Sequence, residues 1–189
     1  MPAKQIAIFA SGEGSNAENI IFYFKGHPSI KVTMVLSDNP QAAVLNKTKA
    51  SGILTCTFTK NEFYETDEIL NLLKDLHIDL IVLAGFLKKI PENIINDFDG
   101  RIINIHPALL PKHGGKGMYG INVHKAVYDS GENETGITIH HVNKNYDEGD
   151  IIFQEKIPLD KNDLPEIIMQ KVRKLELKYY PEIIEKMLS

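Results

Sequence analysis

Short apolar runs rich in β-branched residues alternate with amphipathic segments over the first half of the chain. Such runs are typical of buried strands, and amphipathic segments with apolar residues at helical spacing are typical of surface helices. The predicted strands are Gln5–Ser11, Lys31–Ser37, Leu54–Phe58, Asp79–Ala84 and Arg101–Ile105, and the predicted helices are Asn16–Lys25, Gln41–Ala50, Asn61–Leu76 and Pro91–Asp97. This alternation favours a parallel sheet with helices on both faces and with the most hydrophobic strand, 79–84, near its centre.

The pattern changes after residue 110. Lys112–Gly120 contains four glycines in nine residues, which predicts a loop. Beyond it we expect a helix over Asn122–Tyr128, two antiparallel strands over Thr135–Val142 and Asp150–Pro158, and a C-terminal helix that Pro181 kinks or splits. No repeat or linker divides the chain. The sequence therefore predicts one α/β domain over residues 1–189, with a Rossmann-like, doubly wound, mostly parallel sheet and an antiparallel C-terminal extension.

Charge and composition narrow the classes of function. The net charge of −4 gives no broad basic face for nucleic acid, and the longest apolar run, Leu80–Leu87, is too short to cross a bilayer. No secretory leader is visible at the N-terminus. The single cysteine, Cys56, is expected to be a small buried residue of a core strand rather than a metal ligand. We therefore expect a cytoplasmic protein that binds neither nucleic acid nor membrane.

The segment Ser11–Glu18, SGEGSNAE, follows the first predicted strand and opens the first predicted helix. Gly12, Gly14 and Ala17 fit the dinucleotide fingerprint, and Asp38 lies at the distance of a ribose ligand. A helix N-terminus after a glycine turn also binds a single phosphate, and a plain tight turn is a third interpretation.

Two short polar side chains, Ser15 and Asn16, fill this turn just before the first helix. They suit one compact anion better than a long pyrophosphate. This feature favours a single phosphate, while the dinucleotide and the plain turn stay open.

A second candidate stretch, Asn104–Pro111, reads NIHPALLP and follows a predicted strand. Asn104 and His106 project from the same face at the carboxyl end of that strand, where ligands of open α/β sheets bind. The acidic segment Tyr146–Asp150, YDEGD, lies between the last two strands. A carboxylate from it would raise the pKa of His106. Amide, imidazole and carboxylate together suit attack of an amine on a carbonyl, whereas a satisfied histidine and a solvated turn are the alternative.

Four segments in this order, SGEGSN, VLAGF, NIHPALLP and TGITIHHV…YDEGDII, resemble the phosphoribosylglycinamide formyltransferases, folate-dependent enzymes of purine synthesis. The similarity covers Ile6–Pro181. It implies the formyltransferase fold, and it implies direct transfer of the formyl group of 10-formyltetrahydrofolate to the amine of 5-phosphoribosylglycinamide. It also favours a single phosphate at the glycine turn.

The resemblance implies a set of site residues. The catalytic residues are Asn104, His106 and Asp147, with Asp150 as second choice for the acid. The ribonucleotide residues are Gly14, Ser15, Asn16 and Glu176. Arg173 is added to them because it stands where the family often has a neutral amide and would strengthen a phosphate site. The folate residues are Leu87, Lys88, Lys89, Ile90 and, again, Asn104.

Several features depart from the family or lie outside it. The loop 112–120 is longer and richer in glycine than the common form, so no contacts are assigned to it. A basic residue that some members use to touch folate has no clear match, and Lys60, its weak candidate, is expected to be an ordinary exposed lysine. His140 and His141 face opposite ways, and the inward one is expected to be structural. The other histidines lack metal-ligand spacing, so no metal is expected.

Three rival functions remain at this stage. A 10-formyltetrahydrofolate hydrolase and a methionyl-tRNA formyltransferase usually carry an additional domain, and an acidic chain is a poor partner for tRNA. A non-catalytic NAD-binding sensor explains the glycine turn but gives no role to NIHPALLP or YDEGD. We expect small-molecule substrates only, and a monomer or a homodimer.

Overall fold

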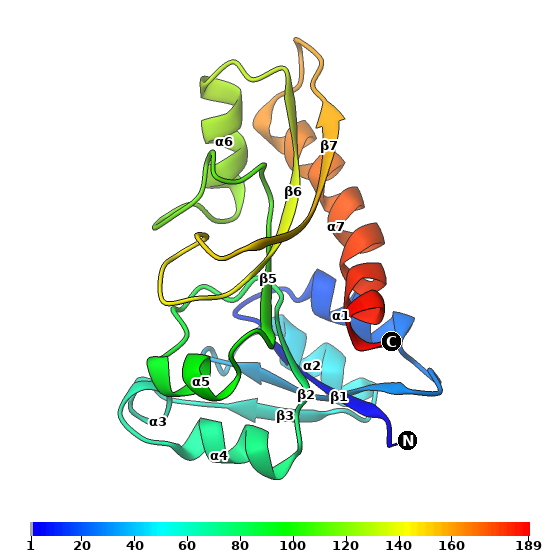
Figure 1. The fold of residues 1–189 in the computed structure, drawn as a ribbon. Helices are drawn as coiled ribbons and strands as arrows, with labels where there is room; N and C mark the ends of the chain where they lie inside the picture. Colours follow the sequence, from blue (N-terminus) through cyan, green and yellow to red (C-terminus); the bar gives the residue numbers. More distant parts are fainter. Residues whose placement is uncertain (1) are drawn as a thin grey trace.

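A computed structural model of the chain describes residues 2–189. Within them the strands are β1 (Lys4–Phe9), β2 (Ile30–Ser37), β3 (Leu54–Thr57), β4 (Leu80–Leu83), β5 (Ile102–His106), β6 (Glu134–His141) and β7 (Ile151–Pro158). They form one sheet in the order β3-β2-β1-β4-β5-β6-β7 (Figure 1). The first five pair in parallel, whereas β6 is antiparallel to β5 and β7 is antiparallel to β6. The predicted fold class and its antiparallel extension are confirmed.

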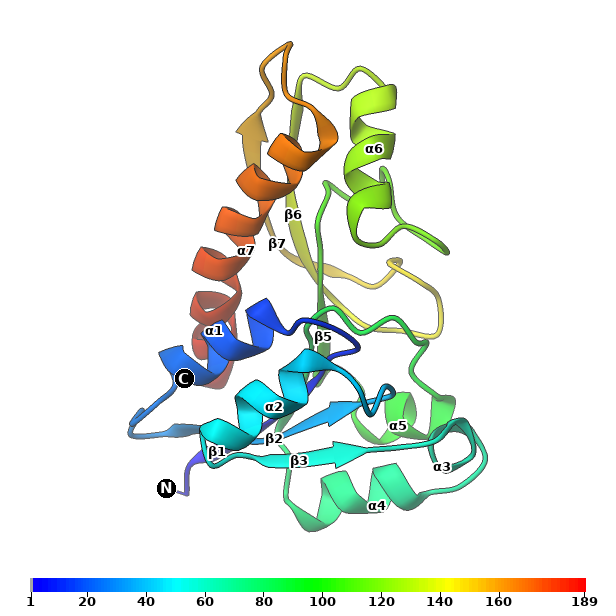
Figure 2. The same cartoon turned by 180° about the vertical axis from the view of Figure 1, so that it is seen from behind.

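Helices cover both faces of this sheet (Figure 2). They are α1 (Ser15–Tyr23), α2 (Ala43–Ala50), α3 (Lys60–Tyr64), α4 (Glu68–Asp75), α5 (Glu92–Asp97), α6 (Ile121–Asp129) and α7 (Pro165–Leu188). One core cluster joins α1, α2, α6 and α7 to one face, and a second joins α3, α4 and α5 to the other. Successive residues of β1 belong alternately to the two clusters, which explains why this strand is a continuous apolar run. No helix within residues 2–189 is long and apolar enough to cross a membrane.

The predicted helix 61–76 is two helices, α3 and α4. Thr66 lies between them, where its hydroxyl donates to the carbonyl of Glu62 and accepts from the N–H of Glu68. A threonine side chain that bonds to the local backbone in this way competes with the helical hydrogen bonds. Sequence periodicity alone missed this break because the apolar spacing continues across it.

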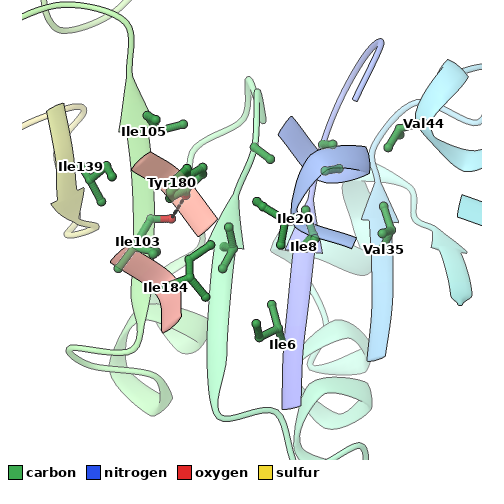
Figure 3. Packing of buried hydrophobic residues seen from close by; sticks show 14 of the residues in the cluster. Ile6, Ile8, Ile20, Val35, Val44, Ile103, Ile105, Ile139, Tyr180 and Ile184 are labelled. Carbon is green, nitrogen blue, oxygen red and sulfur yellow. Dashed lines mark hydrogen bonds between the residues drawn. The ribbon is translucent and has the colours of Figure 1, made fainter. Parts of the chain in front are cut away.

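Pro181 was expected to kink or split the last helix, but α7 runs unbroken from residue 165 to 188. Proline cannot donate to the carbonyl four residues earlier, that of Leu177. The Asn19 side chain of α1 donates to that carbonyl instead, at 2.6 Å. The buried Tyr180 hydroxyl beside the proline donates to the carbonyls of Leu83 and Ile103, so the helix is also tied to β4 and β5 (Figure 3).

Cys56 does not lie in a core strand as predicted. It lies on β3, at the edge of the sheet, and its side chain is only partly buried. Burial raises the pKa of its thiol and the nearby Glu62 raises it further, so the thiol stays protonated at neutral pH. Strand β3 is short and half-exposed. The run of five β-forming residues in the sequence predicts a strand there but not how deeply that strand is buried.

Candidate active site

A cleft of about 700 Å³ opens at the carboxyl ends of the parallel strands, where open α/β sheets bind ligands. Its walls are the turn before α1, the segments that follow β4 and β5, the glycine-rich loop before α6, the segment before β7, and one face of α7. Parts of the chain that are far apart in sequence therefore meet at one place. All the predicted site residues, including the second-choice assignments, can be checked against this cleft.

Gly14 ends the turn that enters α1, and it has a backbone φ of 73°. Glycine is required there twice over, because a Cβ atom would also overlap the side chain of Val44. Gly14, Ser15 and Asn16 all line the cleft, as predicted. The free N–H groups at the start of α1 make this corner suited to an anion.

Asp38, the ribose ligand of the dinucleotide interpretation, does not line the cleft. Its carboxylate accepts a hydrogen bond from Ser11 Oγ at 2.6 Å and lies 3.7 Å from Lys88 Nζ. Ser11 Oγ in turn accepts from the N–H of Leu87 at 3.1 Å. Asp38 therefore ties the first turn to the segment after β4, which weakens the dinucleotide interpretation.

Glu176 of α7 faces the same corner of the cleft and accepts a hydrogen bond from Asn16 Nδ2 at 3.2 Å. Burial raises the pKa of Glu176 to about 7, against the opposing effects of Asn16 and of the nearby Arg173. The Oδ1 atom of Asn16 is buried and has no hydrogen-bond partner within residues 2–189. Arg173 also lines the cleft. The corner thus offers a cation, a carboxyl group that titrates near neutrality, and a free acceptor.

Asn104 and His106 line the cleft together, as their spacing on β5 predicted. β5 is the strand at which the parallel part of the sheet meets the antiparallel part, and there Asn104 pairs directly with His140 of β6. Their side chains meet, with Asn104 Nδ2 3.2 Å from His140 Nε2. The carbonyl of His141 can only accept, so His140 donates to it through Nδ1, 2.8 Å away, and Nε2 is the ring nitrogen turned to the Asn104 amide.

Asp147 completes the cluster from the segment before β7. Its Oδ2 lies 3.5 Å from His106 Nδ1, and its Oδ1 lies 3.6 Å from His140 Nε2. The N–H of Gly115 donates to Oδ2 at 2.9 Å. Asp150, the second choice for the acid, is exposed and does not line the cleft. The structure thus brings Asp147, rather than Asp150, beside the imidazole.

Asp147 raises the pKa of His106, as expected, but the net shift at His106 has the opposite sign. Burial disfavours the imidazolium more than Asp147 and the carbonyl of His113 favour it, and the net pKa of His106 is lowered. For Asp147, burial raises the pKa, but the rings of His140 and His106 and the N–H of Gly115 outweigh it, so the pKa falls. At neutral pH the free protein therefore holds a neutral imidazole next to a carboxylate.

Two histidines of the site were missed from the sequence. His140 was expected to be structural, yet it contacts both Asn104 and Asp147. His124 of α6 also lines the cleft, and burial, together with the nearby His106, lowers its pKa to about 4. Strand register would have revealed His140, because it stands directly opposite Asn104 across the β5–β6 pair. That register is a tertiary property which spacing along one strand does not contain.

Leu87, Lys88, Lys89 and Ile90, the predicted folate residues, all line the cleft. Their segment is held by the Tyr64 hydroxyl, which donates to the carbonyl of Lys89 at 2.9 Å. Lys60, at the start of α3, is exposed and does not line the cleft. In the part of the chain that the structure describes, no group of three His, Cys, Asp or Glu side chains is arranged to hold a metal ion.

Comparison with known proteins gives the relatives of this chain. A family model described as "Formyl transferase" matches residues 4–184. The chain is 38% identical over 187 residues to a chloroplastic phosphoribosylglycinamide formyltransferase of Arabidopsis thaliana, which covers 96% of this chain and 64% of that protein. It therefore spans less than two thirds of that plant relative's length.

A bacterial relative and a solved structure match over nearly their whole length. A phosphoribosylglycinamide formyltransferase of Bacillus subtilis is 35% identical over 191 residues, which is 98% of this chain and 95% of the relative. The crystal structure of phosphoribosylglycinamide formyltransferase from Brucella melitensis superposes with a TM-score of 0.88 at 33% identity, covering 99% of this chain and 96% of that one. With the fold, the cleft and the matched residues in agreement, the chain belongs to the formyl transferase family.

Proposed function

We propose that this chain transfers the formyl group of 10-formyltetrahydrofolate to the amine of 5-phosphoribosylglycinamide, a step of de novo purine synthesis. The observation that carries the proposal is that one cleft holds both the anion corner at Gly14–Asn16 and the cluster of Asn104, His106 and Asp147. The similar proteins named phosphoribosylglycinamide formyltransferase support the same substrates.

Each wall of the cleft then has a substrate to bind. The ribonucleotide phosphate is held by Gly14, Ser15 and Asn16 at the start of α1, with Arg173 as the nearby cation. Glu176 accepts hydrogen bonds from the ribonucleotide. The co-substrate 10-formyltetrahydrofolate lies along the segment 87–90, next to Asn104, and the reaction uses no metal.

The chemistry follows from the protonation states of His106, which is neutral, and of Asp147, which is a carboxylate. The amine attacks the formyl carbon, a C–N bond forms, and the carbonyl electron pair moves to oxygen. Asn104 Nδ2 carries two N–H groups, and the one not used by His140 donates to that oxyanion. Neutral His106 accepts the proton that the attacking nitrogen loses, and Asp147 stabilises the imidazolium. The electron pair on the oxyanion then re-forms the C=O bond, the bond from the formyl carbon to the folate nitrogen breaks, and that nitrogen takes up the proton from the His106 imidazolium.

Direct transfer needs no covalent enzyme intermediate. Cys56, the only cysteine of the chain, lies on the edge strand β3 and does not line the cleft. The folate and the ribonucleotide therefore have to bind together, each in its own part of the cleft. This requirement separates the transferase from a hydrolase, which releases formate from folate alone.

The decisive assay measures release of the folate product with and without glycinamide ribonucleotide. We expect release only when the ribonucleotide is present, with formylated ribonucleotide formed in equal amount. Release at the same rate without it would mean a 10-formyltetrahydrofolate hydrolase. Tight binding of NADH in equilibrium dialysis, with no binding of glycinamide ribonucleotide, would favour the NAD-binding sensor instead.

The remaining expectations on partners and place in the cell are part of the same proposal. Small-molecule substrates suit a cleft of this size, and neither nucleic acid nor membrane is needed as a partner. A monomer or a homodimer and a cytoplasmic location complete it, although the Arabidopsis relative is named as chloroplastic.

A further inference from the structure

Three consecutive residues of the glycine-rich loop, His113, Gly114 and Gly115, contact both members of the catalytic pair. The carbonyl of His113 lies 2.8 Å from His106 Nε2, and the N–H of Gly115 donates to Asp147 Oδ2 at 2.9 Å. We call residues 113–115 the strap. It bonds to imidazole and carboxylate at once, through backbone groups only.

The strap fits closely. A Cβ atom on Gly114 would lie 2.6 Å from Leu110 Cδ2 and 3.3 Å from the Cβ of Asp147, so the backbone packs closely against Leu110 and passes near the acid. His113 has a φ of 56°, a conformation that is uncommon for non-glycine residues, although His, Asn and Asp adopt it more often than the others do. Contacts of the His113 side chain outside the strap can therefore help to hold this conformation.

The carboxylate of Glu132, on the turn between α6 and β6, supplies such a contact. Glu132 Oε1 lies 3.6 Å from His113 Nε2, and Lys112 Nζ donates to both carboxylate oxygens, at 3.0 and 3.2 Å. Lys112, and more weakly His113, lower the pKa of Glu132 against the opposing effect of burial. The side chain of His113 is largely buried, so its pairing with Glu132 is shielded from solvent more than that of the exposed Lys112.

We propose that Glu132 is a positioning residue for catalysis, which holds His113 so that the strap fixes both the ring and the tautomer of His106. This inference rests on the proposed function of His106. A carbonyl only accepts hydrogen bonds, so the strap requires the proton of neutral His106 to sit on Nε2. The nitrogen that takes up and gives back a proton during transfer is then Nδ1, the one turned to Asp147.

Other charged or titratable groups also surround His106, so its protonation has to be measured rather than inferred from Glu132 alone. Asp147 favours the imidazolium, whereas His140 and His113 oppose it. His124 of α6 is near enough for the charge of His106 to affect it. A substitution of Glu132 leaves all these groups around His106 unchanged. It therefore tests the role of Glu132 by itself.

The main test compares Glu132→Gln with Glu134→Gln. Glu134 pairs with Lys156 at the start of β6 and touches neither the strap nor the cleft, so it controls for loss of a surface ion pair. We expect Glu132→Gln to lower kcat roughly five- to tenfold, within the range of coupling between two residues in contact, with little change in either KM. The acid limb of its pH–kcat profile should move to lower pH, because the His113 carbonyl favours the imidazolium. Glu134→Gln should match wild type.

A second variant tests whether His113 and Glu132 act together. His113→Asn removes the imidazole but keeps a residue type that tolerates a positive φ. We expect His113→Asn and the double variant to lose about as much kcat as Glu132→Gln alone, since all three break one interaction. Additive losses would overturn the proposal. So would a lower melting temperature of Glu132→Gln with wild-type kcat and pH profile, which is the outcome for a purely stabilising contact.

The tautomer can be read without any substrate. The ¹⁵N chemical shifts of His106 in the free protein should show a proton on Nε2 and none on Nδ1 in the wild type and in Glu134→Gln, and a mixture of tautomers in Glu132→Gln. A wild-type protein with the proton on Nδ1 refutes the strap's role. Because this measurement does not depend on turnover, failure of the strap and failure of the proposed reaction are told apart.

Discussion

The parallel part of the sheet, β1 to β5, is followed by an antiparallel extension, β6 and β7 (Figure 1), and its central strands are more deeply buried than the outer strand β7. All four residues of β4 are buried, and β1 feeds core clusters on both faces. In contrast, β7 is an edge strand whose residues alternate between exposed and half-buried. The parallel part is thus a platform whose central strands are held by apolar burial, and β6 of the extension is buried in the same core. Only β7 and the segment before it lie at the edge, where polar contacts between Asp147 and the strap help to hold that segment near the cleft.

The two parts of the sheet also contribute different residues to the cleft. The anion corner at the start of α1 and the segment after β4, which the proposed function assigns to binding of the two substrates, belong to the parallel part. Asp147 and His140 come from the extension, and they meet Asn104 and His106 on β5, the strand shared by both parts. If the division is correct, changes in the extension should affect turnover, and changes in the platform should affect stability or substrate affinity.

Replacing the acid of the extension should have the largest effect. Asp147→Asn keeps an acceptor for the N–H of Gly115 but removes the charge beside His106. We expect kcat to fall by about 100-fold or more, the usual range for a group that supports general acid–base catalysis. The acid limb of the kcat profile should shift to lower pH, since the Asp147 charge raises the pKa of His106. Steady-state kinetics across pH measure both effects.

The matched control for this change is Asp150→Asn. Asp150 lies three residues further along the same segment but is exposed and outside the cleft. Its variant should keep the wild-type kcat and pH profile. If the two variants lost the same activity, the segment would matter for its fold rather than for one carboxylate.

A core change should separate the platform from the extension by stability. Ile8 of β1 is fully buried, whereas Ile151 of β7 is 50% exposed. Ile8→Ala should lower the free energy of unfolding by about 2–4 kcal/mol, because a buried cavity is left, and Ile151→Ala by less than about 1 kcal/mol. Denaturant unfolding measures both. Similar losses at the two positions would show that β7 is packed as tightly as the platform.

Much of this fold could be predicted because its buried strands are continuous apolar runs. The sheet, its strand directions and most element bounds follow from that pattern. The misses have local causes: Thr66 interrupts a helix by bonding to its own backbone, and the Asn19 side chain satisfies the carbonyl that Pro181 leaves free. Both depend on one side chain reaching one backbone group, and periodicity does not record such contacts.

The site could be predicted as far as its residues match family motifs. The proximity of Asp147 to His106 was expected, but the sign of the pKa change at His106 was not, because the degree of burial is a property of the whole fold. His140 and the strap were missed for the same kind of reason. Their roles arise from strand register and from a loop that differs from the common form of the family.

The smallest expected effect concerns substrate binding by the platform side of the cleft. Glu176 has a pKa of about 7 in the free protein, so its carboxyl group is half-ionised near neutral pH. If the carboxylate accepts hydrogen bonds from the ribonucleotide, binding favours the ionised form, and the KM for glycinamide ribonucleotide should fall a few-fold as the pH rises through 7. Glu176→Gln should remove this dependence, while its kcat profile keeps the limb that belongs to His106. Initial rates at varied ribonucleotide concentration and pH give both parameters.

The ribonucleotide brings a titration of its own, which the variant separates. A phosphate monoester gains its second charge near pH 6, so the KM should still fall with rising pH in that lower range in Glu176→Gln. Only the component near pH 7 should vanish. Substrate affinity should rise with pH, whereas the stability of the free protein should fall as the pH rises from 4.5 to 7. The stability falls because the folded pKa of Glu176 exceeds its unfolded value of 4.5. A KM that responds to pH identically in wild type and variant would mean that Glu176 does not contact the ribonucleotide, and that the phosphate corner alone sets its affinity.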